Sequence, residues 1–104
     1  MSDETQTRFD FESELIEWRG PAPFVYAPLP EPVAEALRRA AGVLSYGWGC
    51  IPVAAKVGGV AFTTSLFPKD GGYLLPLKVA VRRKTGVTVG DTVAVEMTIN
   101  ARLR

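Results

Sequence analysis

Two stretches of this chain, 44 residues apart, are similar to each other. Residues 36–43 read ALRRAAGV, and residues 80–87 read AVRRKTGV. The same offset carries the strand-like pattern of 49–55 onto 93–99, where apolar residues occupy alternate positions. Two copies of a strand–helix–strand unit predict a pseudo-twofold arrangement, and short strands lose their exposed edges when such a sheet closes on itself.

We therefore expect a mainly β fold, a closed six-stranded pseudo-twofold barrel with two short helices in the order ββαβ-ββαβ. A chain of 104 residues fits one domain. We expect a flexible polar tail over residues 1–8 and the barrel over 9–104. The expected strands are 9–15, 24–26, 48–57, 60–67, 73–75 and 92–99, and the expected helices are 32–41 and 77–85.

Local signals support several of these elements. Gly58-Gly59 predicts a type I′ hairpin turn, which requires positive φ at both central positions. The apolar phase of the first strand slips at Ile16, which predicts a bulge or bend. Gly42 is expected to end the first helix. Residues 77–85 also fit a strand extension, and the helix is favoured because Pro76 and Gly86 flank the segment.

The net charge of +1 gives no global field that would indicate nucleic acid or an anionic membrane as the partner. The charges are unevenly distributed, since residues 1–35 hold eight acids and two bases and residues 36–104 hold three acids and ten bases. A basic face for an anionic partner is one interpretation. The favoured interpretation is that acidic and basic elements are neighbours with solvated surfaces.

Compartment and redox signals are few. Cys50 is the only cysteine, so no disulfide forms within the chain, and its apolar surroundings favour a small buried side chain over a reactive thiol. The first residues lack the basic and apolar regions of a signal peptide, and no segment has the roughly 20 apolar residues of a membrane span. We expect a cytoplasmic bacterial protein without membrane contact.

The chain contains no histidine, which removes the commonest general base and metal ligand. Asp10, Glu12 and Glu14 share one face of a strand, which is typical of its solvent side. Gly90-Asp91 fits a turn before the last strand, and residues 69–72 fit a hairpin loop better than a phosphate site. We expect no catalytic, cofactor or metal site.

The strongest positive cluster lies in the second predicted helix, with a matching pair in the first. Such cations can hold an anion, or they can complement the negative end of a helix dipole while staying solvated, which is the favoured interpretation. The residues of interest are Lys78, Arg82, Arg83, Lys84, Arg38 and Arg39.

Residues 75–95 contain a proline, an arginine-bearing helical turn, Gly-Val and Gly-Asp-x-Val. This pattern resembles the half-barrel signature of AbrB/MazE-type swapped-hairpin proteins, which are usually dimeric DNA-binding regulators. The resemblance implies a double-split barrel. Those relatives build it from two identical chains, whereas here both halves lie in one chain and their flanks differ, so the resemblance does not imply a symmetric DNA-reading surface.

Most of the chain is more similar to an uncharacterised bacterial family, domain of unknown function 1905. The residues that carry this resemblance include 62–68, 72–76, the opening strand 9–15 and Leu29-Pro30. It implies a small β-barrel and no established activity.

We expect a non-enzymatic binding or interaction module for a protein or a small anionic ligand, acting as a monomer or weak homodimer. A nucleic-acid-binding regulator of the AbrB/MazE type is the alternative, which the low net charge disfavours. An enzyme that uses a carboxylate or lysine is a third, weaker reading.

Overall fold

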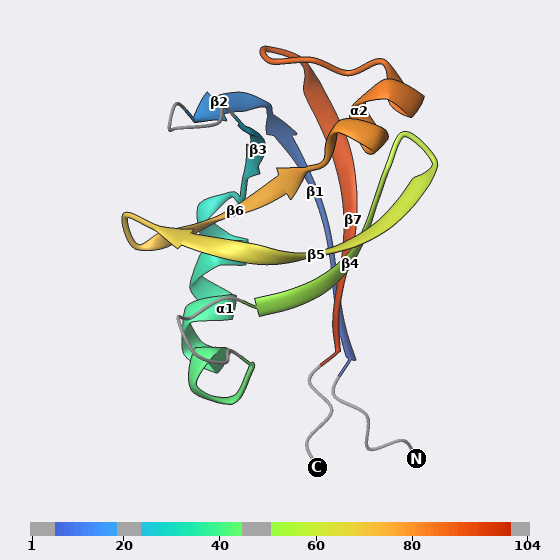
Figure 1. Cartoon of the computed structure of the whole chain (residues 1–104). Coiled ribbons are helices and arrows are strands. Elements are labelled where there is room, and N and C mark those ends of the chain that lie inside the picture. Colours follow the sequence, from blue (N-terminus) through green and yellow to red (C-terminus); the bar gives the residue numbers. More distant parts are fainter. Residues whose placement is uncertain (1–5, 19–23, 45–50, 101–104) are drawn as a thin grey trace.

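The computed structural model describes residues 6–18, 24–44 and 51–100. Seven antiparallel strands form one sheet that curls into an open half-barrel, with a helix near each of two ends (Figure 1). The elements are β1 (Gln6–Glu14), β2 (Ile16–Trp18), β3 (Phe24–Pro28), α1 (Glu31–Leu44), β4 (Ile51–Val57), β5 (Val60–Lys69), β6 (Gly72–Leu77), α2 (Val79–Thr85) and β7 (Thr92–Asn100).

The strand order across the sheet is β1-β7-β4-β5-β6-β3-β2, so the expectation of a closed six-stranded barrel is wrong. The cause lies at Leu15. Its N–H donates to the carbonyl of Asp91 at 2.9 Å, and its own carbonyl accepts from the N–H of Gly90 at 2.9 Å. After this residue the chain leaves β7 and pairs with β3 instead.

The predicted bend near Ile16 is therefore confirmed, and a separate short strand, β2, follows it. β1 and β2 become the opposite edges of the sheet, and within the described residues no ladder joins them. The element order is βββαβββαβ, which differs from the predicted ββαβ-ββαβ.

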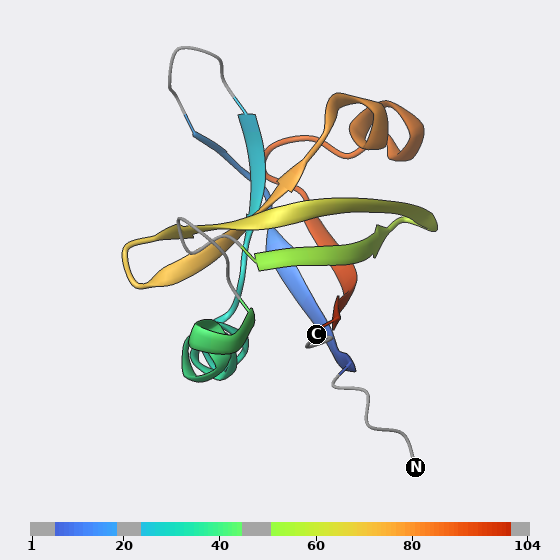
Figure 2. The ribbon, with the colours of Figure 1, turned by 60° about the horizontal axis from the view of Figure 1, so that its bottom comes forward.

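The two similar segments are both largely helical, but their surroundings differ. α1 has 14 residues and packs against β6 and β4, whereas α2 has 7 residues and packs against β5. Figures 1 and 2 show the helices on opposite sides of the β4–β5 hairpin. The sequence similarity therefore does not correspond to matched positions in the sheet.

Boundaries also differ from those predicted. β1 begins at Gln6, inside the segment expected as a tail. α1 continues through Gly42 to Leu44, so Gly42 does not end that helix. The helical alternative for 77–85 is confirmed from Val79 onward, while Leu77 still belongs to β6. Trp48 and Cys50 lie outside the described residues.

Both hairpin turns have the conformation that their residues predict. Gly58 and Gly59 have φ of 57° and 82°, which fits the predicted type I′ turn. Asp70 and Gly71 form the second turn with φ of 53° and 79°.

The core fills the concave side of the half-barrel. Strand residues alternate between this side and solvent, as β4 shows from Ile51 to Val57. Among the described residues the one buried polar side chain is Ser13, whose hydroxyl donates to the carbonyl of Pro28 at 2.6 Å and so links β1 to β3. No described helix is long and apolar enough to cross a membrane.

Candidate functional site

Helix α2 carries the basic cluster and is fixed at both ends. Lys78 precedes the helix in an extended conformation, and Gly86 follows it in the left-handed region with φ of 78°. The hydroxyl of Thr85 donates to the carbonyl of Val81 at 2.8 Å. The three cations Arg82, Arg83 and Lys84 occupy the last turn, where they complement the negative end of the helix dipole.

The sheet splits beside this helix. β5 and β6 leave a shared hairpin and are paired only from Phe67–Leu74 to Lys69–Gly72. Beyond Phe67, β5 continues along β4, while β6 continues along β3 and leads into α2 (Figure 1). The two diverging strands and the helix therefore surround one space, and each contributes side chains to it from a different direction.

A pocket of about 330 Å³ lies at this split, and we call it the α2 pocket. Its lining is mostly apolar, with two cations at the helix side. The volume is at the lower end of the range typical of small-molecule sites. The lining residues are Phe24, Thr64, Pro76, Leu77, Lys78, Val79 and Arg82.

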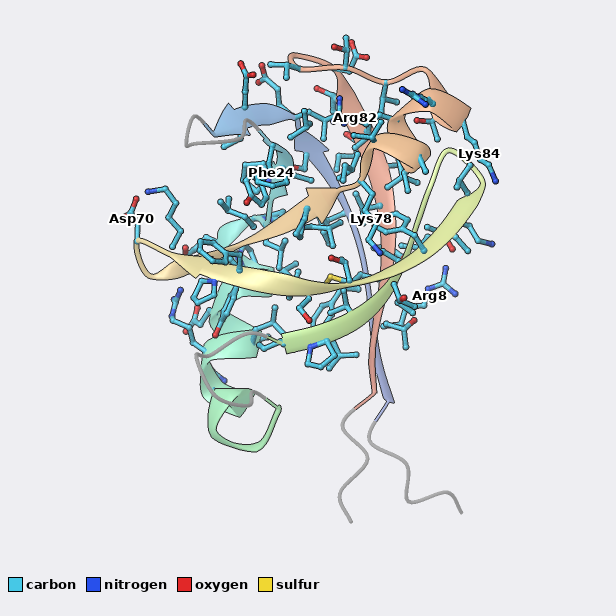
Figure 3. All side chains as sticks on the ribbon, viewed as in Figure 1. Arg8, Phe24, Asp70, Lys78, Arg82 and Lys84 are labelled. Atoms are coloured by element: carbon cyan, nitrogen blue, oxygen red, sulfur yellow. The ribbon has the colours of Figure 1, made fainter. Side chains whose placement is uncertain are left out.

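The two cations of the α2 pocket have no acidic partner among the residues that the structure describes. Within the described residues, no ion pair joins a carboxylate to Lys78 or Arg82. The Nε of Arg82 lies 3.4 Å from the carbonyl of Leu77, a long hydrogen bond that holds the half-buried side chain near β6. Figure 3 shows Arg82 and Lys78 on the side of α2 nearer Phe24, and Lys84 on the side away from it.

Sequence reasoning did not identify the aromatic residues beside this pocket. Phe24 and Phe67 are 52% and 48% exposed, which is unusual for large apolar side chains. The ring of Tyr26 lies between them, with centroids 6.3 Å from Phe24 and 6.4 Å from Phe67. We call these three residues the aromatic strip. The alternation of Phe24 and Tyr26 is a sequence signal for a shared face, but it does not say that this face is the solvent side.

The structure does not bring Arg38 and Arg39 to this site. They project from α1, where Arg38 pairs with Glu31 at 2.8 Å and Arg39 with Glu35 at 3.2 Å. The second pair is an i,i+4 contact on one face of the helix. Arg38 also donates to the carbonyl of Gly71. The hydrogen bond with Glu31 raises the pKa of Arg38, so this guanidinium stays charged and occupied.

The other residues considered from sequence lie elsewhere. Asp10, Glu12 and Glu14 are exposed on β1, and Asp10 pairs with Arg8 at 3.1 Å, which raises the pKa of Arg8. The carboxylate of Asp91 accepts from the N–H of Thr88 at 2.9 Å, as predicted for a turn. In the part of the chain that the structure describes, no three residues with metal-ligating side chains gather.

A larger depression of about 530 Å³ lies over β4, β5 and β7, and no charged side chain lines it. Small residues such as Ala54, Thr63 and Thr98 form its floor. Its polar side chains are the hydroxyls of threonine and serine, so it offers hydrogen bonds but no charge to select an ionic ligand. The α2 pocket is therefore the stronger candidate.

A half-barrel with a split sheet and a cation-rimmed pocket defines a small β-rich domain. The chain belongs to the family described as a domain of unknown function (DUF1905), which matches residues 11–97. The matched region includes α2 and every residue that lines the α2 pocket. No curated protein is significantly similar to the chain.

Proposed function

We propose that this protein is a non-enzymatic binding module whose α2 pocket takes a small organic anion. The observation that carries the proposal is the combination of Lys78 and Arg82, neither of which has an acidic partner within the described ranges, with an apolar wall that includes Phe24. A ligand with a charged group and an apolar body matches both parts of this surface.

The charged group would lie between Lys78 and Arg82. Arginine suits carboxylate and phosphate because its planar donors reach two oxygens at once, and lysine adds a compact charge. Partial enclosure by Val79 and Leu77 lowers the local polarity and strengthens this attraction relative to open water. The apolar body would cover Phe24 and Pro76.

Support for a binding role over a catalytic one comes from the same lining. Among the described residues no carboxylate lines the pocket, and the chain has no histidine. A Lys78 amine acting as a nucleophile would therefore have no side-chain base among the lining residues to remove its proton.

Duplex recognition of the AbrB/MazE type has less support. The two basic pairs lie on different helices at different ends of the molecule, and those on α1 are held in ion pairs (Figure 2). A duplex contact would depend on the four cations at α2, which gives few phosphate contacts.

Phenyl phosphate, inorganic phosphate and benzyl alcohol are suitable probes. Their binding to the protein is measured by ¹H–¹⁵N NMR titration. We expect phenyl phosphate to shift the amide signals of 77–82 and to bind more tightly than either half-probe. Arg82→Gln should weaken binding about tenfold or more, because a hydrogen bond to a charged group contributes roughly 1.5–3 kcal/mol.

The matched control is Lys84→Gln, which removes one charge from the same helix on the side away from the pocket. It should leave phenyl phosphate binding within about twofold, since an exposed charge outside the site acts weakly. Equal losses in both variants, or shifts centred away from α2, would contradict the proposal.

A further inference from the structure

The α2 pocket does not end at Phe24. The ring of Phe24 is followed at 6.3 Å by that of Tyr26, and Tyr26 is followed at 6.4 Å by Phe67. The last two rings are inclined by only 26° to each other. A ligand confined to the pocket would leave two of these three rings uncovered.

The strand register shows that the strip lies on one face. Tyr26 is opposite Pro76 on β6, and Phe67 is opposite Leu74. Leu74 is buried, yet it does not belong to the main core cluster, so its cover comes from the outer side of the sheet. The strip is thus a built surface with an apolar floor.

Acidic residues are absent from this face of β3, β6 and residues 65–69 of β5. On the neighbouring β2, Glu17 is opposite Val25, a core residue, and so belongs to the other set of alternating positions. Asp70 in the hairpin turn is neutralised by Lys69 at 3.0 Å. At the pocket end the face meets Lys78 and Arg82 (Figure 3). The surface is complementary to a chain that repeats planar rings and negative charges.

We propose that the α2 pocket and the aromatic strip together bind a short single-stranded nucleic acid. One phosphate lies between Lys78 and Arg82, and bases lie against Phe24 and successive rings of the strip. This inference rests on the proposed function, and it names the class of ligand for the same pocket.

A single strand is favoured over a duplex for a physical reason. Aromatic side chains bind the faces of bases, and those faces are already stacked on one another in a duplex. Stacking also supplies affinity without a large positive charge, which suits a chain with a net charge of +1. Charge alone would demand many more phosphate contacts.

The test is fluorescence anisotropy with labelled oligo(dT) and oligo(U) of eight nucleotides at low salt, with unlabelled thymidine and uridine monophosphates as competitors. We expect the oligonucleotides to bind at least tenfold more tightly than the monophosphates and to lose affinity as salt rises. A duplex of the same length should bind more weakly than the single strand.

Phe67→Leu is the decisive variant, because Phe67 belongs to the strip and does not line the pocket. It should weaken the oligonucleotide about fivefold or more while leaving the monophosphate unchanged. Arg82→Gln should weaken both. Arg39→Gln on α1 is the control and should weaken neither. Thermal unfolding of each variant verifies that it is folded.

Three results would each overturn the inference. Oligonucleotides that bind no more tightly than monophosphates would show that the aromatic strip takes no part in binding. An oligonucleotide affinity that Phe67→Leu leaves unchanged would show the same. A duplex that binds as well as the single strand would do the same. Phenyl phosphate would still bind at α2 in each case if the proposed function is right, so the two failures are distinguishable.

Discussion

A single hydroxyl group, that of Ser13, links two strands of this small β domain. It lies on the core side of β1, 7% exposed, and donates to the carbonyl of Pro28 on β3. β1 and β3 are not neighbours in the sheet, so this bond crosses the concave side of the half-barrel. It satisfies a carbonyl that the ladder between β3 and β6 would leave to solvent or to the core.

We expect Ser13→Ala to lower the free energy of unfolding by about 1–3 kcal/mol, because the carbonyl of Pro28 loses its partner in a partly buried setting. Urea denaturation measures the change. Glu12→Ala on the exposed side of the same strand is the control and should change stability by less than about 0.5 kcal/mol. A Ser13→Ala variant as stable as the control would show that the bond contributes nothing.

At the site, single residues differ in how far sequence predicts them. Lys78 and Arg82 stand out from their neighbours by charge alone, and both line the α2 pocket. Arg83 and Lys84 share that charge but do not line the pocket, because helix geometry turns them to other sides. Phe67 was unpredictable as a surface residue, since its exposure depends on where β6 separates from β5.

At the scale of elements, the β4–β5 hairpin and α2 contact each other at one glycine. A Cβ at Gly58 would lie 3.0 Å from Cγ2 of Thr85, while a Cβ at Gly59 would meet nothing within 4 Å. Thr85 cannot easily turn away, since its hydroxyl is bonded to the carbonyl of Val81. The hairpin turn therefore sets the position of the helix that carries the pocket cations.

We expect Gly58→Ala to be more destabilising than Gly59→Ala. Both substitutions impose roughly 1–2 kcal/mol of strain at a positive φ, and Gly58→Ala adds a steric conflict with Thr85. Thr85→Ser removes the methyl group and keeps the hydroxyl, so the double variant should recover part of the loss. Denaturant unfolding of the four proteins in a double-mutant cycle measures the coupling. Additive effects would contradict a contact between these elements.

Hairpin turns and the approximate positions of both helices were readable from sequence because they depend on local geometry. Gly58-Gly59 predicts a turn with positive φ, and the apolar phase slip at Ile16 predicts a bulge or a bend. The partners of each strand were not readable in this way. β1 pairs with β7 from the far end of the chain, and no local signal states that choice.

At the scale of the whole molecule, the fold depends on the crossing at Leu15. This residue is 1% exposed, and its backbone is bonded to Gly90 and Asp91 just before β7 begins. It joins the strand at one edge of the sheet to the strand at the other edge. The internal similarity predicted a closed pseudo-twofold barrel because it carried no information about this crossing.

We expect Leu15→Ala to cost about 2–5 kcal/mol, the range for removing most of a buried leucine side chain. Ile16→Ala is the matched control, because Ile16 is the next residue and is 36% exposed. It should cost far less. Circular dichroism and tryptophan fluorescence during urea unfolding should report one shared transition for both variants. Equal stability losses would show that Leu15 has no special part in the core.

The pairing of β1 with β7 has a mechanical consequence. Gln6 is opposite Asn100 at one end of this ladder, and Glu14 is opposite Thr92 at the other end. A force that pulls on Gln6 and Asn100 therefore separates the two strands directly, starting from that end. Force applied there would open the hydrogen bonds one after another, as in a zipper, instead of loading them all in shear. In an optical trap this domain should yield at low tension when held by those ends. Gripped at Gln6 and Thr92 instead, at opposite ends of the ladder, the same hydrogen bonds are loaded in shear and should resist more strongly.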